Sequence, residues 1–586
     1  MSTDQRRNAS RRWRRVRNWS IGALVVAVVA FFYQLFGPSR MVVVSRQSTF
    51  ITEPLGNDGL PDYVEYYRRI SREGVTPENN AAVLLWQAVG PSPVPEELRE
   101  EFFGGLDMPV PADEGKYLER VGSDSMLDAG TQWLNDLNWT PPGPPIDEGS
   151  EFDLSFNDPI DSEPDALPWE LTQRRKEWYE RPVGFAAERP WRSEQLPPLA
   201  AWLEQNSVPL VLAVEASRRP RFYGSFARDP KADGPPLISI KIYTEQEVRY
   251  LARGLAVRAM WHLGEDRIAE AYEDITACQR LSRLVSQSHL YLSQIVAQGM
   301  ETHAIKGLNA LASRLHESPE LCDQVHRDLE RLPMCCDARR GIVHDERIVA
   351  LDSAIYGMRQ IEAGQTGEDD PRYRRVPRGL RRASVDWQSL LTRLNGVFDA
   401  VDKAAATGDV GSAEAEKFLK PAYAFVDEEI DWKKTAAGFF SRRVRTDLIY
   451  HHVGGVLVPF LIPFGNERRT RCYHDLNRVA VALASYRAAN GQYPESLEQL
   501  VPDFIAEVPA DRETGGPLVY ERRTDGFLLY GAGSNETDDG GDDWISTSIV
   551  DGEWTDEKTD VSSFENDYVV RVPIPPVQTA IPAEGR

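Results

Sequence analysis

The sequence lacks the short motifs that identify most enzyme classes, and it lacks an overall excess of positive charge. It contains no G-x-S-x-G, H-E-x-x-H, P-loop or G-x-G-x-x-G pattern, so serine-nucleophile, zincin, phosphate-loop and dinucleotide chemistry have no support. Asp and Glu number 90 against 67 Lys and Arg, which gives a net charge of −23. An acidic surface repels phosphate backbones, so we expect no nucleic-acid partner.

Cysteine is also scarce, with five in 586 residues. No C-x-x-C pair occurs, which argues against a redox motif or a zinc knuckle. The odd number leaves at least one thiol unpaired, and Cys278 fits a small buried hydrophobe on a helix face. Disulfide pairing stays open for Cys278, Cys322, Cys335, Cys336 and Cys472.

The composition is that of a folded protein with several units. It is 41% hydrophobic and 27% charged, values that exclude a wholly disordered, collagen-like or polytopic membrane chain. A chain of this length usually divides into roughly three to four domains. We therefore expect distinct regions along the sequence.

The N-terminal segment has the pattern of a membrane anchor. Its first twenty residues hold seven Arg, and an uncharged stretch follows from Asn18 to Ser39 with an apolar centre at 21–36. A spanning helix needs about 20 apolar residues, and its Arg-rich side stays in the cytoplasm. We predict a cytoplasmic tail at 1–18, a single transmembrane helix at 19–39 and an extracytoplasmic body.

Two other interpretations bear on this topology. Cleavage as a signal peptide is opposed by the only small-residue site, Gly37-Pro38-Ser39, whose central proline departs from the A-x-A pattern. A second apolar run, at 448–464, has 17 residues that include two His, two Gly and two Pro. It is short for a span, so we predict that it packs against protein, and contact with the membrane stays open.

Residues 40–240 read as a loop-rich, tryptophan-rich extracytoplasmic region. A short helix is expected after an N-cap at Thr76, with Pro77 in its first turn and an end before Gly90. Residues 141–165 carry eight acids and no base, a pattern typical of an extended, exposed loop.

Seven aromatic residues lie on either side of that acidic loop. We interpret them as anchors of a loop-rich core, and the alternative is the lining of a carbohydrate or peptide cleft. They are Trp133, Trp139, Trp169, Trp178, Tyr179, Trp191 and Trp202.

Residues 241–465 have the clearest helical pattern. Apolar side chains recur at helical spacing over 245–263 and 268–278, and a third helix is expected through Leu311. The first two helices resemble a tetratricopeptide-type hairpin with a Leu-Gly turn. No 34-residue period recurs, so a generic antiparallel hairpin explains the pattern equally well.

The C-terminal region combines a helix with short strands. An apolar stripe predicts a helix over 472–490 that stops at Asn490-Gly491. Residues 517–523 and 526–533 read as two antiparallel strands joined by Thr524-Asp525-Gly526.

The predicted fold class is therefore α+β, mostly α. It comprises a transmembrane helix, a loop-rich helical outer domain with the hairpin, and a C-terminal helix with a small antiparallel sheet. The predicted boundaries are 1–18, 19–39, 40–240, 241–465, 466–550 for the C-terminal module, and 551–586 for an acidic, proline-containing tail.

The C-terminal module resembles the globular domain of the major pseudopilin of type II secretion systems, over about 470–550. The resemblance follows the helix and rests on YRAANGQYP, the turn at 497–500, PAD, GGPLVY and LYG, in that order. The leader that prepilin peptidase cuts is missing, and about 400 residues of other domains follow the anchor. We therefore do not expect the chain to polymerise as a pilin.

The resemblance implies a calcium site in the loop after the last strand, SNETDDGGDDW. Calcium takes six to eight hard oxygens, and glycines allow a loop to aim several at one point. An alternative stays open, in which the loop is a solvated acidic surface. The implied ligands are Asn535, where the family has its first Asp, and Asp538, Asp539, Asp542 and Asp543.

The outer region as a whole resembles a family of uncharacterised single-span bacterial envelope proteins. That family implies a bacterial inner-membrane location with the bulk outside the cytoplasm, and it brings no assigned activity. The matching stretches are ITEPLGNDGLPDY, GVTPENNAAVLLWQAVGP, WLEQNSVPL, EASRRPRFY and LAVRAMWHLGEDRIAEAYEDITACQRL.

Two functions are consistent with these observations. The first is a membrane-anchored structural or interaction protein with an envelope or secretion-type protein partner. The alternative is an extracytoplasmic hydrolase with its site in the Trp-rich stretch 133–202. One grouping could hold a transition metal, His451-His452 with Cys472 and His474, and we interpret these residues as ordinary packing or surface groups.

Overall fold

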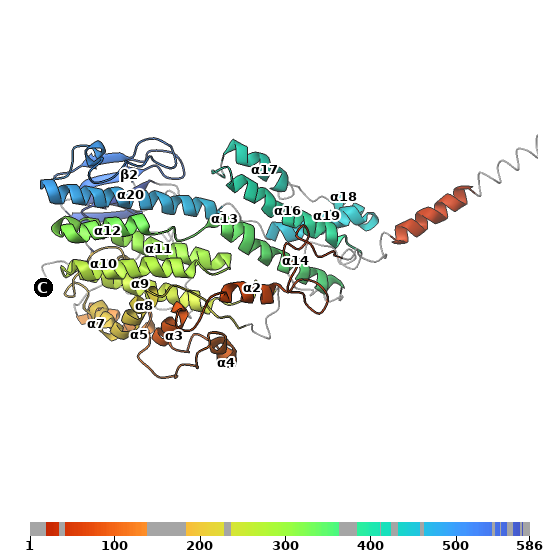
Figure 1. Ribbon diagram of the computed structural model, residues 1–586, viewed down its shortest axis with the longest axis horizontal. Helices are drawn as coiled ribbons and strands as arrows, with labels where there is room; N and C mark the ends of the chain where they lie inside the picture. The colour runs from red at the N-terminus through yellow and green to blue at the C-terminus, as the bar shows by residue number, and fades with distance from the viewer. Residues whose placement is uncertain are drawn as a thin grey trace, which may run out of the picture.

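The protein is mostly helical and carries a small antiparallel sheet, which confirms the predicted α+β, mostly α class (Figure 1). The structure, a computed structural model, describes residues 19–33, 42–136, 183–227, 236–362, 384–408, 410, 412–423, 432–456, 462–541, 545–550, 553–558, 567–574 and 577.

The helices fall into a large body and a smaller second lobe. The body contains α2 (Tyr63–Arg72), α3 (Ala81–Val89), α4 (Glu96–Gly105), α5 (Asp124–Asp136), α7 (Pro197–Gln205), α8 (Ser207–Ser217), α9 (Tyr243–Gly264), α10 (Ile268–Val285), α11 (Tyr291–Ala312), α12 (Pro319–Arg331) and α20 (Ile462–Asn490). The chain passes to the second lobe through α13 (Ala338–Arg340) and the π-helical turn η3 (Gly341–Glu346), and the lobe contains α14 (Arg347–Glu362), α16 (Trp387–Ala405), α17 (Ala413–Tyr423), α18 (Trp432–Phe440) and α19 (Arg442–Val456).

The body is built in layers. In Figure 1 the sheet lies on α20, α20 lies on α11 and α12, and α10, α9 and α8 follow below. The predicted helices over 245–263 and 268–278 and through Leu311 are confirmed as α9, α10 and α11. They break at Asp266, whose φ of 61° reverses the chain between α9 and α10.

The cap of α3 differs from the prediction. The helix begins at Ala81 and its N-cap is Asn80, not Thr76. Asn80 Oδ1 accepts hydrogen bonds from the amides of Ala82 at 3.1 Å and Tyr223 at 3.0 Å. A buried side-chain oxygen that accepts hydrogen bonds from two segments fixes the start of the helix more strongly than the proline at 77 does. The second segment is distant in the sequence, so a local sequence pattern does not reveal it.

Helix α20 is buried on two opposite faces. Its predicted stripe, which includes Leu476, Val479 and Leu483, packs against the sheet, while Val481 and Ala484 join the core of the helical body. The helix begins at Ile462, ten residues before the predicted start. A helix that is apolar around much of its circumference belongs in an interior, and here it joins two layers.

The sheet contains one strand that the sequence analysis assigned to the tail. Strands β1 (Val519–Arg522) and β2 (Phe527–Gly531) form the predicted hairpin, and β5 (Tyr568–Val572) pairs antiparallel with β2 on its other side. A separate hairpin joins β3 (Ile545–Val550) to β4 (Glu553–Lys558). Strand β5 therefore belongs to the module, and the folded unit extends past 550.

A buried ionic cluster links α10, α11 and α20. Glu301 is fully buried, and Arg283 donates to it through Nη1 at 2.8 Å. Nε2 of His474, on α20, lies 2.9 Å from the same carboxylate. Burial alone raises the pKa of Glu301, but the charge of Arg283 and the contact with His474 outweigh burial and hold it at about 2.

The second apolar run is divided between two helices. Leu448, Ile449 and Tyr450 are buried in α19, and α20 begins at Ile462. Residues 457–461 lie outside the described part of the chain. The buried side chains at the start of the run 448–464 agree with the prediction that this run packs against protein.

Residues 19–33 form a helix that projects from the second lobe, beyond α18 (Figure 1). Most of its side chains are exposed, including Leu24 at 65% and Val26 at 68%. Within the described residues, no helix is both long enough and apolar enough to cross a membrane. Residues 34–39, the second part of the predicted span, are not among them.

Candidate functional site

The predicted calcium loop follows β2, and its described side chains bond mostly to one another. Asn535 Nδ2 donates to Asp539 Oδ2 at 3.0 Å. Asp538 Oδ1 accepts from the Tyr530 hydroxyl at 3.0 Å and from the Gly540 amide at 2.9 Å. Among the described residues neither Asp538 nor Asp539 belongs to a group of three His, Cys, Asp or Glu donors that could share an ion, and Asp542 and Asp543 lie outside the described residues.

The sequence analysis missed the carboxylate at the centre of this loop, Asp567. It is only 2% exposed and lies directly before β5. Its Oδ2 accepts from the amides of Asp539 at 3.0 Å and Gly541 at 2.8 Å. Its Oδ1 is buried and has no hydrogen-bond partner among the residues that the structure describes.

The electrostatics of Asp567 favour neutralisation. Burial, and then the negative charges of Asp539 and Asp538, raise the pKa of Asp567 to about 6, although two backbone amides oppose the shift. A buried carboxylate oxygen without a partner is costly. Either a proton or a cation next to Oδ1 removes that cost.

Two glycines shape the loop around this carboxylate. Gly540 and Gly541 have φ values of 76° and 77°, a conformation that side chains disfavour. A Cβ at Gly541 would lie 2.9 Å from Leu528 Cδ2 and 3.1 Å from the Tyr530 ring. The Gly-Gly step therefore lets the chain turn tightly enough for the Gly541 amide to reach Asp567.

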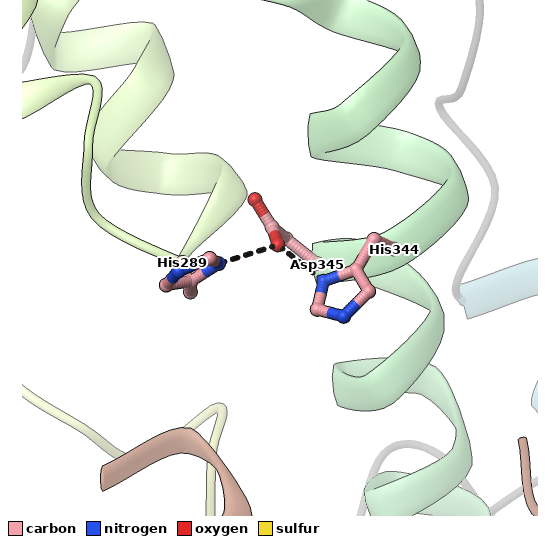
Figure 2. A group of neighbouring side chains, drawn as sticks. All are labelled: His289, His344 and Asp345. Carbon is pink, nitrogen blue, oxygen red and sulfur yellow. Dashed lines mark hydrogen bonds and ion pairs between the residues drawn. The ribbon is translucent and has the colours of Figure 1, made fainter. Parts of the chain in front are cut away.

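A second cluster lies in the body, where the α10–α11 turn meets η3. His289 comes from the turn, and His344 and Asp345 come from η3 (Figure 2). Asp345 Oδ1 lies 2.8 Å from His344 Nδ1 and 3.3 Å from His289 Nδ1. Within the described residues this is the only group of three His, Cys, Asp or Glu side chains whose donor atoms lie close enough to share an ion.

Neighbouring residues contact the atoms of Asp345 and His344 that point away from the centre of this cluster. Gln294 Nε2 donates to Asp345 Oδ2 at 3.0 Å. The Tyr66 hydroxyl of α2 lies 3.2 Å from His344 Nε2. Both contacts leave the Nδ1 atoms and Oδ1 directed toward one another, as Figure 2 shows.

The burial of the three groups differs. Asp345 is completely buried, whereas His289 and His344 are 25% and 29% exposed. Burial alone raises the pKa of Asp345, but the hydrogen bonds from both imidazoles, with the nearby charge of Arg340, hold it below its ordinary value. The carboxylate is therefore ionised at neutral pH and faces two imidazoles at the protein surface.

Backbone geometry also singles out this region. Phe50 has a φ of 59°, which is unfavourable for an aromatic residue. Its ring meets the His344 ring edge-on at 5.7 Å, and the Arg347 guanidinium lies 4.5 Å from its centroid. A π-helical turn and a left-handed aromatic residue are features that concentrate at functional sites.

The sequence signal for the cluster was weak. His289 is 55 positions before His344, and no spacing rule links a loop histidine to a His-Asp pair. The grouping considered from sequence does not form among the described side chains, since His451, Cys472 and His474 do not converge. The side chain of His452 lies outside the described residues.

The remaining sequence interpretations concern cysteines and aromatics. All five cysteines are free and buried, which answers the open question of pairing. Trp191 and Trp202 are buried in the core, and Trp133 packs against it. These three are core anchors, and the acidic loop at 141–165 lies outside the described residues, as do the aromatics Trp139, Trp169, Trp178 and Tyr179.

Comparisons of this chain with protein-family models, with curated proteins and with solved structures find no match. The likeness to pseudopilins and to single-span envelope proteins therefore stays a prediction from the sequence. Any function has to be argued from the sites themselves.

Proposed function

We propose that the protein is a membrane-anchored, extracytoplasmic interaction protein whose C-terminal module binds calcium. The observation that carries the calcium proposal is the buried, unpartnered Oδ1 of Asp567 beside an acidic, glycine-containing loop. The protein partner belongs to the same proposal and is expected in the cell envelope.

Calcium suits this carboxylate for physical reasons. The ion prefers oxygen donors and combines carboxylates with backbone carbonyls and water. Asp538 and Asp539 lie close enough for their charges to raise the pKa of Asp567, so a cation would relieve repulsion among three acids. Loop carbonyls and the acids at 542 and 543 would supply the other oxygens.

The anchor proposal rests on the N-terminal sequence and on the helix at 19–33. Seven Arg precede this helix, and its apolar side chains are exposed. Its end contacts the second lobe, since the rings of Phe31 and Phe440 are 5.6 Å apart and Arg442 Nη2 donates to the Tyr33 carbonyl at 3.3 Å. We infer that the end of the lobe with α18 faces the membrane.

An exposed sheet edge supports the interaction role. Strand β1 is at the edge of the three-stranded sheet, and Val519 on it is 38% exposed. Edge strands present free backbone groups to which a partner can add a strand. This edge is the first surface to test for a protein contact.

Calorimetric titration of the full chain in detergent, stripped with EDTA, tests calcium binding. We expect about one ion per chain and a higher thermal midpoint with calcium, since a ligand that binds only the folded state stabilises it. Asp567→Asn should remove both effects. Asp525→Asn, in the exposed β1–β2 turn, is the matched control and should retain them.

Two results would oppose the calcium proposal. If millimolar calcium produced no heat of binding and no change in the thermal midpoint, the loop would be a solvated acidic surface. Binding that persists in Asp567→Asn would place the ion elsewhere in the chain.

Localisation has its own test. In a bacterial host the full chain should remain in the membrane pellet after alkaline carbonate extraction. Protease added to spheroplasts should digest the body. Release by carbonate, or protection of the body, would contradict the anchored, extracytoplasmic arrangement.

A further inference from the structure

We propose that His289, His344 and Asp345 form a binding site for a divalent transition metal ion such as Zn²⁺. The site lies in the helical body and is separate from the carboxylate loop of the C-terminal module. Its donors are two imidazole nitrogens and one carboxylate oxygen.

The two distances from the carboxylate oxygen to the imidazole nitrogens fit a shared ion. Ligands that bind zinc at about 2.1 Å are separated by about 3.0 Å at a right angle and about 3.4 Å at a tetrahedral angle. The separations of Asp345 Oδ1 from His344 Nδ1 and His289 Nδ1 are 2.8 and 3.3 Å. All three donor atoms lie within 4.8 Å of one another.

The outer contacts resemble those that fix metal ligands. Histidine ligands usually bond through the second ring nitrogen to a neighbouring group, and ligating carboxylates are held by hydrogen bonds. Here Tyr66 contacts Nε2 of His344, and Gln294 donates to Oδ2 of Asp345. These contacts orient the two side chains, and a bound ion would replace the hydrogen bonds that join the two Nδ1 atoms to Oδ1.

The donor types select the class of ion. Imidazole suits zinc and other late transition metals, whereas calcium and magnesium require oxygen. Three protein donors leave a coordination position for water, the arrangement of catalytic rather than structural zinc. The side chains of His289 and His344 are 25% and 29% exposed, so water and a small ligand can reach the ion.

One positive group lies nearby. Arg340 Nε is 3.6 Å from Asp345 Oδ2, the carboxylate oxygen on the side of Gln294. Arg340 also donates through Nη2 to the Ser288 carbonyl at 3.1 Å. Its contact is therefore with the oxygen that does not face the imidazoles, and Oδ1 remains the donor for a cation.

The test uses the full chain in detergent, stripped with a chelator and titrated with Zn²⁺. Bound zinc is counted by elemental analysis after gel filtration, and Co²⁺ replaces it to report coordination by its visible absorption bands. We expect one zinc per chain and a Co²⁺ spectrum with nitrogen and oxygen donors.

Two histidine variants decide whether this site is responsible. His289→Asn removes a partly exposed donor and should weaken zinc binding at least 100-fold, and His344→Asn should do the same. The matched control is His326→Gln on α12, a histidine of similar exposure at 26% that pairs with Glu330. This control should bind zinc as the unchanged protein does.

Circular dichroism and the thermal midpoint show whether each variant is folded. A folded His289→Asn that retains stoichiometric zinc would overturn the proposal, and so would an unchanged protein that binds none. In that case the cluster is a hydrogen-bonded His–Asp–His group only. Asp567→Asn should leave zinc binding intact, so this test is independent of calcium binding.

Discussion

The carboxylate loop and the His–Asp cluster are built in opposite ways. The loop is contiguous and rich in acids and glycine, and it encloses one buried carboxylate, Asp567. The cluster joins a turn to a π-helical segment and has two nitrogen donors. Sites with only oxygen donors and sites with nitrogen donors prefer different ions. We therefore expect the loop to bind calcium and the cluster to bind zinc.

The difference also concerns rigidity. Asp345 is held by Gln294 within the helical body. Asp567 is held by the amides of a loop that depends on Gly540 and Gly541. We therefore expect the cluster to be shaped before an ion binds, whereas the loop gains order and stability from its ion.

The largest expected effect comes from breaking the interface under α20, on which the C-terminal module rests. Glu301→Gln leaves Arg283 without its buried counter-charge and should destabilise the protein by about 3–5 kcal/mol. Denaturant unfolding measures the change. Glu317→Gln, at a partly exposed ion pair, should cost below about 1 kcal/mol. Equal effects would mean that the buried cluster does not stabilise the interface.

The next effect is a pH dependence specific to the loop. The pKa of Asp567 is raised from 3.8 to about 6, so the folded state holds its proton more tightly than the unfolded chain does. In EDTA, stability from this group is present at low pH and is lost as pH rises through about 6, by on the order of 2 kcal/mol.

The comparison of the unchanged protein with Asp567→Asn, over about pH 4–7, isolates this contribution. The variant should lose less stability than the unchanged protein by this amount, while burial also raises the pKa values of Glu245 and Glu346 to about 7 and their contribution remains in both proteins. Calcium should also suppress the loss from Asp567 in the unchanged protein, since the ion favours the ionised carboxylate. Parallel pH profiles for the two proteins would contradict the assignment.

A smaller effect tests the shape of the loop. Gly541→Ala combines a positive φ with close contacts to Leu528 and Tyr530, whereas Gly515→Ala has a φ of 70° and open space around it. Gly515→Ala should cost about 1 kcal/mol, and Gly541→Ala about 1–2 kcal/mol more. Thermal unfolding measures both, and only Gly541→Ala should weaken calcium binding.

The smallest effect concerns the outer contact of the cluster. Tyr66→Phe removes the hydroxyl beside His344 Nε2 and should weaken zinc binding about tenfold, the low end for such a contact. Tyr117→Phe loses a hydrogen bond to the Ala112 carbonyl and serves as the control. Loss of calcium binding in Tyr66→Phe would show that the two regions are not independent.

The sequence predicted local features well and long-range features poorly. Periodicity placed α9, α10 and α11, and the hairpin of β1 and β2, because those patterns report which face of each element is buried. Asp567 falls in the predicted acidic tail, although the YVVRV that follows it, rich in β-branched residues, is a strand signal.

What sequence reasoning missed has a common physical cause. Asn80 caps α3 with help from Tyr223, and His289 meets Asp345 across two elements. Each pairing depends on how helices pack, and single-sequence patterns carry no information about packing partners. A His-Asp dipeptide was the only available hint of the cluster.

The most direct test of the central claim is equilibrium dialysis of the full chain in detergent against equal concentrations of Ca²⁺ and Zn²⁺, followed by elemental analysis. The unchanged protein should retain one of each ion. Asp567→Asn should lose only calcium, and His289→Asn only zinc. Retention of both ions by either variant, or of neither ion by the unchanged protein, would contradict two sites with separate selectivity.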